Sequence, residues 1–309
     1  MQHRGCCTCS VVAASKREGS SPTGSIGRSL AQQLVAAGDR VRVLAEPDQC
    51  QGWPASVEVV EGSVVSPTSQ TGVWSGVETL FLAGAQPATV AKLLRIARVA
   101  RVQRIVLLSS HGPEYEEAYP PETWFWLAIE KAVQHSGILA TIIRPSAVMG
   151  SMIEGTYPAP GSGWPEMIRT AGVVREPFAT TGHYPFIHED DLAAVAAAAL
   201  RGDVGEGHVL EAVGPPVSTR SRVAGIEEAL GRAIQLRGLS SEEARARWRQ
   251  DGWPDGAIDV TLYALEEYST RLEELTQWTP DQRPTVAEVV GRVPRSYADW
   301  AKENVGMFR

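Results

Sequence analysis

The strongest constraint on the fold is an alternation of two sequence patterns in the first half of the chain. Short apolar, β-branched runs predict strands at residues 9–14, 41–45, 57–60, 79–83, 104–109 and 140–144. Segments of amphipathic, helical periodicity lie between them, at residues 26–37, 87–101 and 122–136. Strands separated by helices of this length form βαβ units, in which parallel strands share one sheet and helices cover both of its faces. We therefore predict an α/β fold built on a parallel sheet.

The pattern changes after Pro145. Residues 150–186 are rich in Gly, Pro and Thr, and an alanine-rich helix at 189–200 and a strand at 207–213 follow. The remainder is mainly helical in pattern, with breaks at residues 252–254 and 279–284. We expect the chain to divide near residue 150.

Composition and charge exclude several classes of protein. The chain has 309 residues, 43% of them hydrophobic, and a net charge of -7. A mildly acidic chain is a poor match for the nucleic-acid backbone, and no apolar run approaches the ~20 residues of a membrane span. We expect a cytoplasmic protein without nucleic-acid or membrane partners, and the sequence leaves the oligomeric state open.

The four cysteines all lie within the first 50 residues. Cys6 and Cys9 form a CxxC pair, but no second pair of ligands follows at the spacing of a zinc site. We predict reduced thiols and no metal.

A glycine motif, TGSIGR at residues 23–28, follows the first predicted strand and leads into the first predicted helix. Glycines at this point let the backbone approach a pyrophosphate, which then faces the amides of the helix N-terminus. An ordinary strand-to-helix turn would also explain so short a motif. Its place in a complete βαβ opening favours nucleotide binding.

The chain also resembles the NmrA-like family of atypical short-chain dehydrogenases/reductases, from about residue 10 to its end. The resemblance rests on TGSIGRSLAQQLVAAGDRVRVL, RIVLLSS, IEKAVQHSGILATIIRPSAVMG, YPFIHEDDLAAVAAAAL and GHVLEAVGPPVSTRSRVAGIEEALGR. It implies a Rossmann-like, doubly wound domain (1–150), a smaller, mainly helical substrate lobe (151–309) with segments returning to the first domain, and NAD or NADP as cofactor. It also implies that His188, in IHEDD, makes a structural hydrogen bond at the turn into a helix.

The cofactor motifs depart from the family pattern. Ser21 replaces the first of three glycines, residues 16–21 lengthen the turn, and Ser63 replaces an aspartate that meets the adenine. Glu46 stands where an arginine often holds the 2′-phosphate of NADP; a carboxylate repels that phosphate but can accept from the ribose diol. The pattern favours NAD, although Arg28 could still serve the phosphate, and it predicts weak or absent binding.

The reaction centre departs as well. Ser109 or Ser110 matches the superfamily serine at the end of the fifth strand, but the tyrosine and lysine positions fall at Glu122 and Trp126. Tryptophan cannot replace the ammonium group of lysine, so the resemblance argues against ordinary carbonyl reduction.

The candidate site residues fall into three groups. The predicted catalytic residues are Ser110, His111, Glu122 and Tyr184. The predicted cofactor contacts are Ser21, Gly24, Ser25, Ile26, Gly27, Arg28, Glu46, Ser63, Ala83, Gly84 and Ser109. The predicted substrate pocket comprises Tyr115, Trp126, Met149, Trp164 and His183. Its large apolar side chains fit a core equally well.

Three functions follow. The favoured one is an NAD(P)-dependent oxidoreductase that acts on a small aromatic or polyketide-like molecule. The second is a non-redox enzyme for cyclisation, elimination, hydration or rearrangement, and the third is an NAD(P)-sensing regulator without turnover. The fold does not decide between them.

Overall fold

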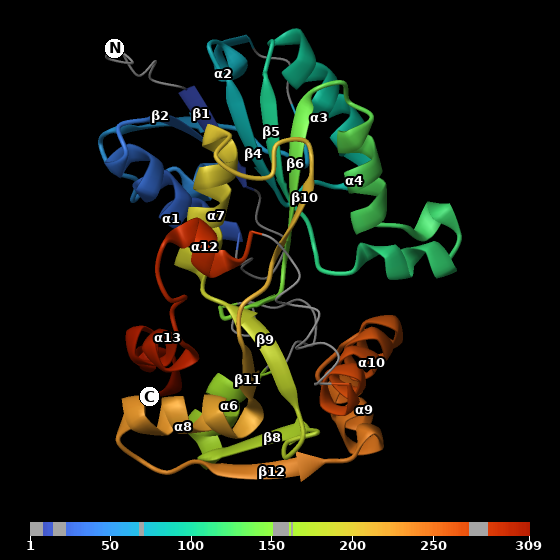
Figure 1. Cartoon of the computed structure of the whole chain (residues 1–309). Coiled ribbons are helices and arrows are strands. Elements are labelled where there is room, and N and C mark those ends of the chain that lie inside the picture. The colour runs from blue at the N-terminus through green and yellow to red at the C-terminus, as the bar shows by residue number, and fades with distance from the viewer. Residues whose placement is uncertain (1–8, 15–22, 68–70, 151–160, 162, 272–283) are drawn as a thin grey trace.

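The computed structural model describes residues 9–14, 23–67, 71–150, 161, 163–271 and 284–309. Its centre is a seven-stranded parallel sheet of order β10-β6-β5-β4-β1-β2-β3 (Figure 1). The strands are β1 (Cys9–Ala14), β2 (Arg40–Ala45), β3 (Val57–Glu61), β4 (Thr79–Ala83), β5 (Arg104–Leu108), β6 (Leu139–Pro145) and β10 (Val209–Ala212). The strand order reverses between β1 and β4, which is the switch point where doubly wound sheets bind nucleotides.

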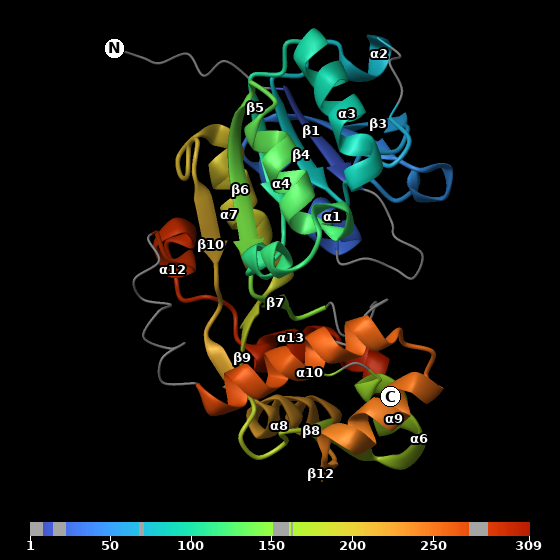
Figure 2. The ribbon, with the colours of Figure 1, turned by 90° about the vertical axis from the view of Figure 1, so that its right-hand side faces the viewer.

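Helices cover both faces of this sheet, as the alternating pattern predicts. The helices α1 (Thr23–Ala36) and α7 (Glu189–Arg201) pack together on one face, and α3 (Pro87–Val99) and α4 (Trp126–Gln134) on the other (Figure 2). In β4, Phe81 joins the core under α1 and α7, while Leu80 and Leu82 join the core under α3. A strand buried on both faces has no polar side, which explains its uninterrupted apolar sequence. A short helix, α2 (Thr71–Trp74), precedes β4.

One predicted helix begins later than expected. The pattern placed a helix at residues 122–136, but α4 starts at Trp126, and Glu122 lies in the short 3₁₀ segment η3 (Pro121–Thr123). The buried carboxylate of Glu116 sets the start, because it accepts the backbone N–H groups of Phe125, Trp126 and Leu127 at 2.9, 3.1 and 2.9 Å. Such an acceptor supplies the partner that the first amides of a helix lack.

The C-terminal half contains more strands than its sequence pattern suggests. The lobe holds β7 (Ala147–Val148), β8 (Val173–Pro177), β9 (His183–Ile187), β11 (Pro216–Ser218) and β12 (Gln235–Leu239). These form a three-stranded β11-β9-β7 sheet and a β12-β8 pair. The lobe helices are α6 (Trp164–Ala171), α8 (Thr219–Leu230), α9 (Ser241–Gln250), α10 (Asp255–Thr270) and α13 (Tyr297–Glu303).

The two parts of the chain are interwoven. The helix α7 and strand β10 complete the first domain, and α12 (Val286–Val290) packs on α7. The chain then returns to the lobe, where α13 packs on α8. Three 3₁₀ segments besides η3 complete the described structure: η1 (Pro47–Gln49), η2 (Pro113–Ala118) and η4 (Val305–Phe308).

Within the described part of the chain, no helix has both the length and the apolar character needed to cross a membrane. Among those same residues, no three His, Cys, Asp or Glu side chains gather as metal ligands would. Cys6 lies outside the described residues, and Cys50 is a free thiol.

Candidate active site

The cofactor side of the site starts at the N-terminus of α1. Gly24 is exposed, and a Cβ atom built on it would meet nothing within 4 Å, so there is open space beside the first turn. The first amides of a helix, which have no partner within it, suit a pyrophosphate in such a space. Ser25 is half-buried, and Ile26 and Gly27 are buried against the sheet. Ser21 lies outside the described residues.

The structure brings Glu46 and Ser63 together. Glu46 follows β2 and Ser63 follows β3, and the Ser63 hydroxyl donates to the Glu46 Oε1 atom at 2.8 Å. Gly62 permits this turn, because a Cβ there would lie 2.4 Å from Leu44 Cδ1. The carboxylate is therefore held at the end of β2, where a dinucleotide ribose lies in this class of fold.

Arg28 is engaged elsewhere. Its guanidinium lies 4.5 Å from the Trp53 ring and donates to the carbonyl oxygens of Gly52 and Gln51 at 3.1 and 3.3 Å. These contacts hold the guanidinium against the loop that follows η1. The alternative role, in which Arg28 holds a 2′-phosphate, would require it to leave them.

The central strands contribute the remaining cofactor candidates. Ala83 ends β4 and is fully buried, and Gly84 follows with a φ of 73°, a conformation that favours glycine. Ser109 follows β5 and is also buried. These three residues lie at the carboxyl edge of the sheet, together with the N-terminus of α1.

A charged cluster lies at the other end of this edge, and the sequence analysis missed three of its members: Glu130, Arg144 and Glu211. The Ser109 hydroxyl donates to Glu130 Oε1 at 2.5 Å. Glu130, on α4, is 1% exposed and also accepts from Arg144 Nε at 3.0 Å and Nη2 at 2.7 Å. This bidentate contact fixes the arginine, which lies near the end of β6. Ser110 follows and is half-buried.

Arg144 joins further carboxylates to the cluster. Its Nη1 atom pairs with Glu114 and lies 3.5 Å from Glu211 Oε1, on β10. The second Glu211 oxygen lies 3.1 Å from His111 Nδ1. Burial disfavours the charged guanidinium, but the hydrogen bonds and charges of Glu130 and Glu114 outweigh it and raise the pKa of Arg144. The cluster thus links the ends of β5, β6 and β10.

The lobe contributes one aromatic residue that the sequence analysis also missed. Tyr268, on α10, packs edge-to-face on Tyr184 with the ring centroids 6.1 Å apart. Burial raises the pKa of the Tyr268 phenol, and the negative charge of Glu211 raises it further. The phenol therefore lies within electrostatic reach of the charged cluster. In the sequence it is one aromatic residue in an ordinary helical pattern.

Two of the five predicted substrate residues, and one predicted catalytic residue, lie in the core of the lobe. Met149, Trp164 and Tyr184 are buried in one apolar cluster there. Trp126 is half-buried, His183 bonds the carbonyl oxygen of Thr181 at 2.9 Å, and Glu122 is exposed. The side chain of Tyr115 lies outside the described part. The roles of these residues stay predictions.

A buried arginine explains part of this core. Arg222, on α8, is fully buried, and its guanidinium lies 4.3, 5.6 and 4.9 Å from the rings of Trp164, Tyr184 and Phe186. Its Nη2 atom pairs with the buried carboxylate of Glu176 at 3.2 Å, which also accepts from Trp164 Nε1 at 2.7 Å. The arrangement ties α8 to α6 and β8.

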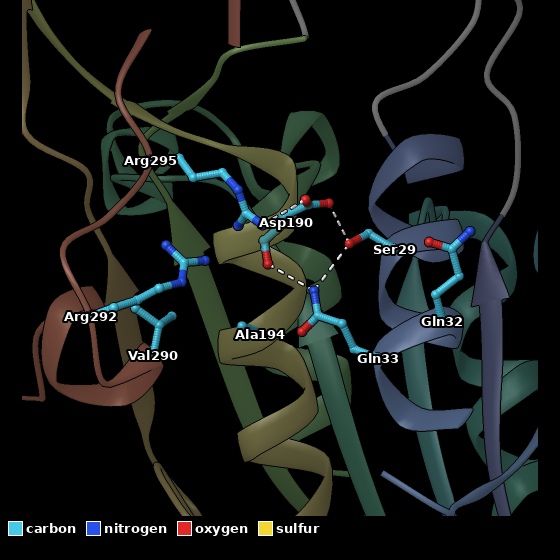
Figure 3. A pocket seen from close by; sticks show the side chains of 8 residues that line it. All are labelled: Ser29, Gln32, Gln33, Asp190, Ala194, Val290, Arg292 and Arg295. Atoms are coloured by element: carbon cyan, nitrogen blue, oxygen red, sulfur yellow. Dashed lines mark hydrogen bonds and ion pairs between the residues drawn. The ribbon is translucent and has the colours of Figure 1, made fainter. Parts of the chain in front are cut away.

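The expected role of His188 is confirmed. It is the N-cap residue of α7; its Nδ1 atom accepts the Asp190 backbone N–H at 3.1 Å, and its Nε2 atom lies 3.2 Å from Glu303. Next to it, a pocket of about 360 Å³ opens between α1, α7 and the segment after α12 (Figure 3). There Ser29 donates to Asp190 at 2.6 Å, and Arg295 pairs with the same aspartate at 3.1 Å.

Comparisons with known proteins agree with this architecture. Residues 22–202 match the model of a family described as NAD(P)H-binding. A reductase of (4-alkanoyl-5-oxo-2,5-dihydrofuran-3-yl)methyl phosphate from Streptomyces griseus is 30% identical over 292 residues, covering 93% of this chain and 96% of that protein. An NAD(P)H azoreductase from Xenophilus azovorans is 25% identical, covering 82% and 84% of the two chains.

Solved structures share the whole fold. The NADPH-dependent quinone oxidoreductase QOR2 from Escherichia coli has a TM-score of 0.70 and 18% identity, over 96% of this chain and 99% of that one. The negative transcriptional regulator NmrA, in complex with NAD, has a TM-score of 0.68 and 15% identity, over 96% and 95%. The chain belongs to the NAD(P)H-binding family, as an NmrA-like atypical short-chain dehydrogenase/reductase with a Rossmann fold.

Proposed function

We propose that the protein is a reductase that uses NADH in preference to NADPH and reduces an electron-poor, conjugated bond of a small aromatic or polyketide-like metabolite. When bound, the dihydronicotinamide supplies the hydride. The amides at the N-terminus of α1, with Gly24 and Gly27, would hold the pyrophosphate. Glu46 would accept hydrogen bonds from the adenosine ribose, and Ala83, Gly84 and Ser109 would flank the bound cofactor.

One observation carries the choice of substrate: the Ser109 hydroxyl donates to the buried carboxylate of Glu130 at 2.5 Å. A hydroxyl gives its single hydrogen to one strong acceptor, and Glu130 is clamped in place by Arg144. Ser109 therefore does not supply the donor that polarises an isolated carbonyl group. The family positions for tyrosine and lysine hold Glu122, which is exposed, and Trp126, which has no ammonium group. A conjugated acceptor needs less help, because its own carbonyl or ring delocalises the incoming electrons.

The names of similar proteins support the same class of acceptor. The Streptomyces griseus protein acts on a dihydrofuranone that carries an alkanoyl group, and the other two are an azoreductase and a quinone oxidoreductase. These acceptors share a conjugated, electron-poor system rather than an isolated carbonyl group.

The test follows oxidation of NADH and of NADPH by absorbance, with menadione, a 2-acylbutenolide and, as the control, a saturated aldehyde. We expect turnover with the conjugated acceptors, faster with NADH, and none with the aldehyde. Reduction of the aldehyde alone would contradict the proposal. Thermal stabilisation by NADH without turnover would favour the regulator, and no response to either nucleotide would favour the non-redox enzyme; at 100 times its dissociation constant a ligand stabilises by about 2.7 kcal/mol.

The cofactor preference has a separate test. Glu46→Arg removes a carboxylate that repels the 2′-phosphate and adds a cation that attracts it, so we expect a shift towards NADPH. Ser63→Ala is the matched control, since it removes the partner of Glu46 and leaves its charge. An unchanged preference in Glu46→Arg would show that Glu46 does not set the choice of cofactor.

A further inference from the structure

A histidine–carboxylate pair lies at the charged edge of the sheet. His111 follows β5 by three positions, and its Nδ1 atom is 3.1 Å from Glu211 Oε2. The histidine side chain is 30% exposed, whereas that of Glu211 is 11% exposed. One partner thus reaches solvent and the other is anchored in the fold.

The sheet itself fixes Glu211. The strands β10 and β6 are parallel neighbours, and Glu211 lies opposite Arg144 in their register. Arg144 is held in turn by Glu130, and it lies 3.5 Å from the Glu211 oxygen that does not face the histidine. The two Glu211 oxygens therefore have different partners, and the one that faces His111 is oriented by the other.

Several charged and titratable groups surround this pair. They come from η2, α4, β6 and the lobe helix α10: Glu114, Glu130, Arg144 and Tyr268. With Glu211, these groups include three carboxylates and one guanidinium. A proton on the imidazole is therefore placed beside a carboxylate, within a cluster that is negative overall.

We propose that His111 is the acid that protonates the reduced substrate and that Glu211 is its positioning residue; this inference rests on the function proposed above. In the step, hydride adds to the β-carbon of the conjugated acceptor, the carbon–carbon π bond breaks, and its electron pair moves into an enolate. The imidazolium gives its Nε2 proton to the enolate, and the neutral imidazole regains a proton from water. Glu211 holds the ring through Nδ1 and compensates its charge, which is the role of a carboxylate behind a catalytic histidine.

The experiment compares His111→Gln, Glu211→Gln and Glu117→Gln with the wild type. Glu117→Gln is the matched control, because Glu117 lies on the neighbouring segment η2, is 57% exposed and pairs with Lys131 at 3.7 Å, outside the charged cluster. The readouts are kcat against pH for NADH oxidation with a 2-acylbutenolide, the solvent deuterium isotope effect, and NADH affinity from fluorescence.

We expect His111→Gln to lower kcat by about a hundredfold or more, which is the range of general acid catalysis. It should also abolish the fall of kcat at alkaline pH and leave NADH affinity unchanged. Glu211→Gln should lower kcat by about tenfold and leave NADH affinity unchanged, because an amide no longer compensates the imidazolium during the step. Glu117→Gln should keep the wild-type profile.

Two results would overturn the inference in distinguishable ways. If the wild type turns over and His111→Gln keeps its kcat, pH profile and isotope effect, the inference fails and the proposed function stands. If the wild type oxidises neither nucleotide with any conjugated acceptor, the proposed function fails and the inference fails with it. Unfolding of each variant by denaturant checks that the substitutions act on the chemistry and not on folding.

Discussion

Two arginines, one in each half of the molecule, are held by different sets of partners. Arg144, at the edge of the parallel sheet, contacts the carboxylates of Glu130, Glu114 and Glu211. Arg222, in the lobe, is fully buried, pairs with Glu176 alone among the carboxylates of the described chain, and packs against three aromatic rings. The first arginine has several acidic partners, and the second has one.

The difference indicates what each cluster is for. When a guanidinium has several carboxylates, one of them can be lost or protonated while the others remain, which suits a site where charge changes during a reaction. The buried Arg222–Glu176 pair has no such additional carboxylate, so removal of either partner leaves a buried charge without compensation. Under the function proposed above, the charged cluster would serve the chemistry, whereas the lobe pair serves the packing of α8 on α6 and β8.

The largest expected effect comes from breaking the lobe pair. Arg222→Leu leaves the Glu176 carboxylate buried without its cation, and we expect a loss of about 3–5 kcal/mol in the free energy of unfolding, measured with denaturant. The double variant Arg222→Leu/Glu176→Leu removes both charges and should recover most of that loss. For comparison, Glu114→Gln removes an exposed partner of Arg144 and should cost less than about 1 kcal/mol. A double variant as unstable as the single one would contradict this view of the pair.

The same pair should impose a pH dependence on stability. Burial raises the pKa of Glu176 above its ordinary value of 4.5, although the charge of Arg222 and the hydrogen bond from Trp164 oppose the shift. The folded state then keeps this proton at a pH where the unfolded state has lost it. The contribution to stability is therefore complete below pH 4.5 and is lost as the pH rises through the folded pKa. Unfolding free energies over this range should show the decline in the wild type and not in the double variant; equal slopes would contradict it.

A smaller effect is expected from a substitution in the charged cluster around Arg144. Ser109→Ala removes a hydrogen bond to a buried carboxylate, and we expect a loss of about 1.5–3 kcal/mol in unfolding free energy. The rate of NADH oxidation should fall only modestly, because the hydroxyl steadies Glu130 and does not donate to a substrate. Ser29→Ala is the matched control, since Ser29 donates to the Asp190 carboxylate at 2.6 Å on the other face of the sheet. A selective collapse of turnover in Ser109→Ala would place the serine in the reaction.

The sequence alone predicts the strands of the parallel sheet well, and β1 and β4 have the predicted bounds. Strands buried on both faces show continuous apolar runs that are readable locally. By contrast, β8 and β9 were missed because they are short and contain charged, proline and aromatic residues. Their pairing partners, β12 and β11, lie far along the chain. Non-local pairing leaves little trace in a local pattern.

Some residues of the candidate site could likewise be predicted from the sequence, and others could not. Glu46, Ser63 and His111 follow predicted strands, so the rule that ligands gather at carboxyl ends identifies them. Arg144 and Glu211 lie inside strands, where a charged residue carries no sign of its partner. Only the register of β6 beside β10 places them opposite each other. A charged side chain inside an otherwise apolar strand was the signal that could have found Arg144.

The smallest expected effects compare one helix start in each half of the molecule. Glu116 accepts three backbone N–H groups at the start of α4, and Ser240 caps α9 in the lobe through a capping box. Loss of either cap should cost about 1 kcal/mol of unfolding free energy. However, α4 carries Glu130, so a shifted first turn in Glu116→Ala should disturb the clamp on Arg144 and slow NADH oxidation, while Ser240→Ala should leave the rate unchanged. If both variants lose the same stability and neither loses rate, the position of α4 does not control the charged cluster. The contrast between the two halves would then depend only on Arg144 and Arg222.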